Sequence, residues 1–188
     1  MENSIQKLTE KITSYNIFNN LLPGIVFCYL IERFSNITLT TNKLLEDFFI
    51  YYFIGIVISR IGSLFIKWVL EKIGIVQPKS PILNPTSYEN YIEASKSDSF
   101  LKILNETNNT YRTLIALFTS ILAIVLYEHL LSDTLHTLIT IKFGLNMKIV
   151  LLIILCAFLI FLFTLSYKKQ SQFIESRVTH YIKTKNKL

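Results

Sequence analysis

A basic residue stands inside one of the apolar segments of this sequence, at Arg60 in FIYYFIGIVISRIGSLFIKW (residues 49–68). A charged side chain costs about 2.5–3.5 kcal/mol at the centre of a membrane helix, and such residues commonly mark ion or substrate pathways. Ser59 and Ser63 add hydroxyl groups beside it. We therefore predict that Arg60, Ser59 and Ser63 form a polar site within the membrane that lines a pore or cavity.

Arg60 could also have one of two different roles. Lys67 lies seven residues further on, about 10 Å along a helix, so the guanidinium can extend to headgroups at that level. Arg60 can also pair with Glu32, although we expect Glu32 to lie nearer the opposite face of the membrane. The three roles predict different surroundings for the same side chain.

A second polar group occupies one face of the segment LNETNNTYR. Asn105, Asn109 and Arg112 recur at helical spacing, and Asn108 stands beside them. Amide groups and a guanidinium can bind a phosphate or the edge of a base. We predict a ligand site at these four residues, with a solvated helix face as the alternative.

Catalytic and metal-binding patterns are missing from the sequence. His129, His136 and His180 lack the spacing of metal ligands, and the five glycines form no phosphate-binding loop. Cys28 and Cys156 both lie in apolar runs, where cysteine usually acts as a small apolar residue. We therefore expect no enzyme activity, no catalytic residue, no cofactor and no metal.

The elements that carry these residues are membrane spans. Of the 188 residues, 51% are hydrophobic and only 17% are charged, whereas soluble domains carry about 25% charged residues. Four segments approach the roughly 20 apolar residues that cross a bilayer, at 21–39, 48–68, 113–131 and 149–167. The predicted fold is an all-α polytopic membrane protein with four transmembrane helices.

Basic residues predict the orientation of the spans. The two terminal segments and the segment between the second and third spans hold 14 Lys and Arg when Lys67 at its edge is counted, and the two other loops hold 4 when Arg33 is counted. Because Lys and Arg accumulate on the cytoplasmic side, we expect both termini in the cytoplasm, in a bacterial inner membrane. The tail at 168–188 has six basic residues and one acidic residue, which favours anionic lipid, with a nucleic acid or nucleotide as the alternative.

Helices are also expected outside the membrane. Residues 1–20 form an amphipathic pattern that leads into Pro23 and Gly24, which can act as a gating hinge or as a static kink. Residues 71–112 are predicted to form a helical cytoplasmic layer. No Pro or Gly follows Phe100 until after the third span, so one helix of about 30 residues is expected to run from this layer into the membrane.

The arrangement resembles that of small four-span proteins of bacterial antiphage defence. The resemblance rests on SIQKLTEKITSYNIFNNLLPG at the N-terminus, on the four spans and on NETNNTYR before the third span. It is greatest to the channel effector of the Hailong system and next to the membrane subunit of the Kiwa system. The first family implies a tetrameric channel controlled by an oligonucleotide that a nucleotidyltransferase makes. The resemblance covers the architecture and transfers no functional residue.

Together these patterns predict a homo-oligomeric channel, with a tetramer favoured, that is gated from the cytoplasm. The gating agent is expected to be a nucleotide, an oligonucleotide or a cytoplasmic partner protein. A gated channel has to be an oligomer, because four short spans cannot enclose a wide aqueous path. The alternative is a membrane-anchoring sensor or scaffold that docks a cytoplasmic effector and does not conduct ions.

Overall fold

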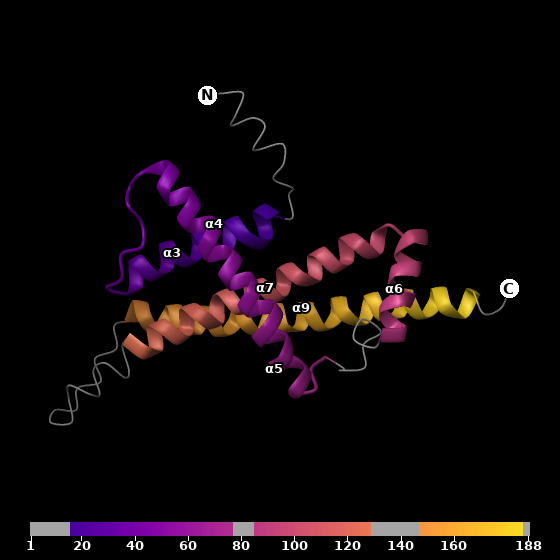
Figure 1. Ribbon diagram of the computed structural model, residues 1–188. Coiled ribbons are helices and arrows are strands. Elements are labelled where there is room, and N and C mark those ends of the chain that lie inside the picture. Colours follow the sequence, from indigo (N-terminus) through magenta and orange to yellow (C-terminus); the bar gives the residue numbers. More distant parts are fainter. Residues whose placement is uncertain (1–15, 77–84, 129–146, 186–188) are drawn as a thin grey trace.

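The computed structural model describes residues 16–76, 85–128 and 147–185, and within these ranges the chain is helical and contains no strand. Two of the elements are π-helical turns, written η. In chain order the elements are η1 (Ile17–Leu21), α3 (Leu22–Phe34), α4 (Leu44–Ile61), η2 (Gly62–Ile66), α5 (Lys67–Lys72), α6 (Pro85–Ser97), α7 (Phe100–Leu126) and α9 (Met147–Lys185) (Figure 1). The predicted N-terminal helix lies largely outside the described residues.

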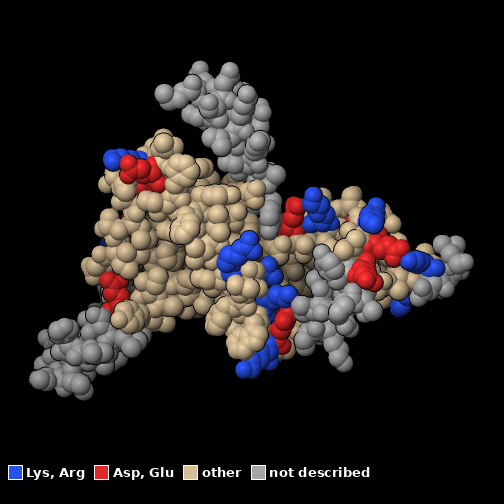
Figure 2. Space-filling model, in the orientation of Figure 1, with Lys and Arg blue, Asp and Glu red and all other residues tan. Residues whose placement is uncertain are grey.

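Four helices are long and apolar enough to span a membrane, which confirms the predicted all-α polytopic fold. They are Ile17–Phe34, Leu44–Lys72, Phe100–Leu126 and Met147–Lys185. In Figure 2 the part of the molecule where they gather is almost entirely uncharged, and the Lys, Arg, Asp and Glu side chains lie around its edges. An uncharged belt bounded by charge is the surface that a bilayer requires.

Pro23 does not break the first span. A proline removes one N–H group and its ring clashes with the carbonyl group four residues earlier. The wider π-helical turn η1 precedes Pro23, with the Leu22 N–H donating to the carbonyl oxygen of Ile17, and such turns commonly absorb this strain. The first span is therefore one continuous helix through the Pro23–Gly24 pair.

Glycines set the closest contacts of the second span. A Cβ atom on Gly55 would lie 1.6 Å from the carbonyl oxygen of Asn20, and one on Gly24 would lie 1.8 Å from that of Tyr51. Further along, a Cβ atom on Gly62 would lie 2.9 Å from the carbonyl oxygen of Arg112. Small residues let membrane helices approach this closely, so the second span packs against the first and third spans through backbone contacts.

α7 and α9 lie side by side. At one end, α6 covers them over a second apolar core that is separate from the core of the spans; its buried members are Ala94, Leu101, Leu104, Ile174 and Val178. We call this the α6 end. The prediction of one long helix entering the third span is confirmed by α7, which has 27 residues. α9 continues without a break through the predicted basic tail as far as Lys185.

Carboxylates hold the loop at the opposite end of the bundle. Glu32 accepts hydrogen bonds from the backbone N–H groups of Leu39 (2.8 Å) and Thr40 (2.6 Å), and Glu128 accepts one from that of Asn36 (2.9 Å). These bonds turn the chain back after Phe34, so the first span ends five residues before the predicted Leu39. We call this the 35–43 end.

Candidate functional site

A polar cavity of about 410 Å³ lies where the first three spans meet, toward the α6 end. Its walls come from η1 and the residue before it, from α4 with η2, and from α7. The lining residues are Asn16, Asn19, Asn20, Tyr52, Ile56, Ser59, Arg60, Ser63, Asn109 and Arg112. The cavity thus brings together the predicted intramembrane residues Arg60, Ser59 and Ser63 and two of the four predicted ligand residues.

A hydrogen-bond network ties together the three helices around this cavity. The Asn19 side chain, 5% exposed, donates to Ser59 Oγ (2.8 Å) and accepts from Thr113 Oγ1 (2.8 Å). Thr113, 1% exposed, shares its hydroxyl hydrogen between Asn19 and the carbonyl oxygen of Asn109 (3.1 Å). Buried amides and hydroxyls need such partners, so Asn19, Ser59 and Thr113 fix the relative positions of the first, second and third spans.

Arg112 is partly buried beside the cavity. Its Nη2 donates to Asn109 Oδ1 (2.9 Å). Its Nε is inaccessible to solvent and has no hydrogen-bond partner within the described part of the chain. An unsatisfied buried donor is costly, and among the described residues no carboxylate forms an ion pair with this guanidinium.

Arg60 is exposed at the cavity wall, and its carbonyl oxygen accepts a hydrogen bond from Ser63 Oγ (3.0 Å). The suggested pair with Glu32 is wrong, because Glu32 binds Leu39 and Thr40 at the 35–43 end. Arg60 lines this cavity and is exposed, so extension of its guanidinium to the headgroups stays a prediction. Whether that cavity belongs to a pore stays a prediction as well.

The four predicted ligand residues do not all line the cavity. Asn108 is buried and donates to Ser171 Oγ (3.1 Å) on α9, so it joins two helices instead of facing the cavity. Asn105 lies one helical turn from Asn109 toward the α6 end and does not line the cavity. Only Asn109 and Arg112 point to the same site, because Asn108 lies about 100° around the helix from Asn109.

The predicted hinge residues Pro23 and Gly24 are buried in a continuous helix. Gly24 lies at the close crossing of α3 over α4, so packing explains its small size. Gating by this pair stays a prediction.

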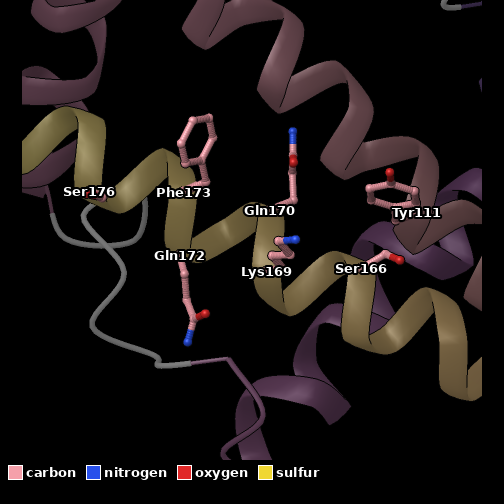
Figure 3. Close-up of a pocket in the computed structure, with 7 residues that line it drawn as sticks. All are labelled: Tyr111, Ser166, Lys169, Gln170, Gln172, Phe173 and Ser176. Carbon is pink, nitrogen blue, oxygen red and sulfur yellow. The ribbon is translucent and has the colours of Figure 1, made fainter.

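Two further hollows lie near the α6 end. The larger, about 650 Å³, is lined along α9 and by Tyr111; its residues are Tyr111, Ser166, Lys169, Gln170, Gln172, Phe173 and Ser176 (Figure 3). The other, about 520 Å³, surrounds Arg177, which already pairs with Asp98 (2.6 Å). The Gln170 amide donates to the carbonyl oxygen of Leu104 (3.2 Å). Neither hollow is lined by two arginines from different helices, as the first cavity is.

No group of three or more His, Cys, Asp and Glu side chains that could hold a metal ion occurs in residues 16–76, 85–128 and 147–185. The chemistry available to the first cavity is therefore that of guanidinium, amide and hydroxyl groups, with no carboxylate among its ten lining residues. Such a donor set suits an anion.

Half of the ten lining residues were not predicted from the sequence, and neither was Thr113, which bonds to Asn19; the five lining residues are Asn16, Asn19, Asn20, Tyr52 and Ile56. Asn19 and Asn20 precede the Pro-Gly pair, and Thr113 begins the apolar part of α7. Polar residues at one depth in three successive spans are the only sequence signal that points to them.

Comparison of the chain with protein-family models, with curated proteins and with solved structures gave no match.

Proposed function

We propose that this chain assembles into a homo-oligomeric membrane channel that is gated from the cytoplasm by a nucleotide or oligonucleotide ligand or by a partner protein. The α6 end is the cytoplasmic side in this proposal, both termini lie there, and the membrane is a bacterial inner membrane. The resemblance to antiphage membrane effectors favours a role in such a defence system and a tetrameric assembly.

The observation that carries the proposal is the position of the polar cavity relative to α7. The cavity takes its walls from three spans, and one of them, α7, runs without a break from the cavity to the apolar core beneath α6. A ligand that draws Arg60 and Arg112 together would therefore shift α7 relative to α4. A partner that moves α6 would act on the same helix from its other end.

The exposed apolar surface supports assembly. Within one copy of the chain, only 11% of the residues in the most apolar stretch of α9 are buried. That face contacts lipid or other copies of the chain, and a channel needs several copies to surround an aqueous path.

A scaffold without conductance is the second candidate, and the core beneath α6 favours it. This core stands outside the apolar bundle and leaves large side chains exposed around it, among them Ile92, Phe100, Ile103 and Phe173. Exposed apolar side chains beside a folded core are typical of a protein-binding surface.

The deciding experiment combines mass and conductance. We expect light scattering of the detergent-purified protein to give a closed oligomer of four or more copies, and planar bilayers to show currents that oligonucleotides alter. The double variant Asn109→Ala with Arg112→Ala should assemble and lose that regulation, while the control Lys102→Ala, exposed on the same helix, should keep it. A monomer, or an oligomer without currents under any condition, would exclude the channel.

A further inference from the structure

We infer that the cavity between the first three spans binds a phosphate group, held between the guanidinium groups of Arg60 and Arg112. This inference deepens the proposed function, on which any role in gating rests. Phosphate binding itself does not depend on conductance and is tested without it.

The cavity is lined by two cationic side chains and by no acidic one. These are Arg60 and Arg112, and neither arginine forms an ion pair among the described residues. Arg177 shows how this chain satisfies an arginine when a carboxylate is available, because it binds Asp98 through Nη2 (2.6 Å) and Nε (2.8 Å). Arg112 is half-buried, and a partly desolvated cation gains from a counter-charge, which an anion in the cavity supplies.

The donor arrangement favours phosphate over a small halide ion. Guanidinium groups bind phosphate oxygens well, and two of them line the cavity from different helices. Part of the Arg112 guanidinium is already used by Asn109 and by the Tyr167 hydroxyl, so its remaining N–H groups are the ones that a phosphate would use. Asn109 uses its side-chain oxygen to hold Arg112, which leaves its amide nitrogen to donate. Ser59 accepts from Asn19, so its own hydroxyl hydrogen is free to point toward a phosphate oxygen.

The size of the cavity admits more than an ion. Its volume of about 410 Å³ falls in the range of about 300–1,000 Å³ that is usual for ligand pockets. Tyr52 and Ile56 add apolar surface to its wall. A phosphate with an attached sugar or glycerol therefore fits, which leaves two sources: a soluble phosphorylated compound, or the headgroup of an anionic phospholipid.

The test uses the full chain in lipid nanodiscs and measures its unfolding temperature, because a ligand that binds only the folded state raises that temperature. One set of discs contains phosphatidylcholine alone and the other contains added phosphatidylglycerol. Each set is titrated with inorganic phosphate, and sodium chloride of equal ionic strength serves as the salt control. The variants are Arg60→Gln, Arg112→Gln and Arg112→Lys, with Lys102→Gln as the matched control.

A soluble source predicts that phosphate raises the unfolding temperature of the wild type and of Lys102→Gln in phosphatidylcholine discs. A lipid source predicts that phosphatidylglycerol raises it and that added phosphate then has little further effect. In both cases each Arg→Gln variant should bind the phosphate about 10- to 100-fold more weakly. Arg112→Lys should bind phosphate more tightly than Arg112→Gln and more weakly than the wild type. Lysine keeps the positive charge but cannot form the two parallel hydrogen bonds of a guanidinium.

The inference is overturned if neither phosphate nor phosphatidylglycerol stabilises the wild type more than chloride does, or if Arg60→Gln responds as the wild type does. Arg60 is exposed, and in the described part of the chain its side chain forms none of the hydrogen bonds that hold the spans together. Its variant should therefore fold even if Arg112→Gln does not. Stabilisation by phosphate in a protein that carries no current would support the site and exclude the channel. Ion currents from a protein that phosphate does not stabilise would support the channel and exclude the phosphate site.

Discussion

Thr113 Oγ1 donates a hydrogen bond of 2.8 Å to the side-chain oxygen of Asn19, and this bond joins the start of the first span to the middle of α7. Both residues are at least 95% buried. The same Asn19 amide donates to Ser59 on α4 (2.8 Å), so three spans share one amide group. The polar cavity keeps its shape through this contact.

Thr113→Val should therefore destabilise the protein by about 1–2 kcal/mol. Valine fills the same volume but leaves Asn19 Oδ1 without its donor in a buried site. This exceeds the average of about 0.6 kcal/mol for hydrogen bonds in membrane proteins, because an orphaned group remains. Thermal unfolding in detergent measures the difference. Thr110→Val is the control, since among the described residues the Thr110 hydroxyl bonds only to the Glu106 carbonyl of its own helix. Equal effects of the two variants would contradict the role given to Thr113.

Gly55→Ala should prevent correct packing of the first two spans. Its Cβ atom would lie 1.6 Å from the carbonyl oxygen of Asn20, and backbone cannot withdraw as a flexible side chain does. Gly62→Ala should be milder, because the corresponding distance to Arg112 is 2.9 Å. The yield of folded protein and its unfolding temperature should rank the wild type first, then Gly62→Ala, then Gly55→Ala. A Gly55→Ala protein as stable as the wild type would exclude this helix crossing.

Arg177→Gln should loosen the core beneath α6 and leave the spans intact. Arg177 pairs with Asp98 and lies over the rings of Phe100 and Phe173, at 5.2 and 5.7 Å from their centres. Loss of these contacts should cost about 1 kcal/mol, which corresponds to roughly fivefold faster hydrogen exchange in α6 and the adjoining end of α7.

Lys185→Gln is the matched control for this effect. It removes the ion pair with Glu93 (2.6 Å), whose side chains are 56% and 42% exposed, so its effect on exchange should be smaller. Faster exchange in the apolar part of α9 after Arg177→Gln would show that the two cores unfold together.

The proposed orientation of the chain predicts which introduced thiols react from outside the cell. Cys28 and Cys156 are 0% and 1% exposed, so the wild type should resist a membrane-impermeant maleimide. Thr38→Cys, at the 35–43 end, should react in intact cells. Lys183→Cys, at the α6 end, should react only after the membrane is permeabilised. The opposite pattern would reverse the proposed topology.

Much of the membrane architecture could be predicted from sequence because the bilayer imposes it. Apolar length revealed all four spans, and the absence of Pro and Gly after Phe100 predicted the long helix α7. The end of the first span could not be predicted, because three hydrogen bonds to Glu32 determine it and all come from a loop. Side-chain contacts of this kind leave no periodic signal.

The candidate site was predicted as two separate halves. Arg60 was expected in a pore and Arg112 in a ligand site, since nothing in the sequence places position 60 beside position 112. That relation depends on how α4 crosses α7, which Gly62 permits by contacting the Arg112 carbonyl. Asn108 was grouped with Asn109 in the predicted ligand site, but it bonds to Ser171 on α9. Helical spacing alone cannot distinguish a face toward a cavity from a face toward another helix.

The unbroken length of α9 has a mechanical consequence. The helix, 39 residues long, continues for about 27 Å beyond Tyr167, at 1.5 Å per residue. Over that length, a tilt of about 5° at Tyr167 displaces the end of the helix by about 2.4 Å. A small tilt of α9 among the spans would therefore become a larger displacement at Lys185, and a protein bound to that end of the helix would be moved by it.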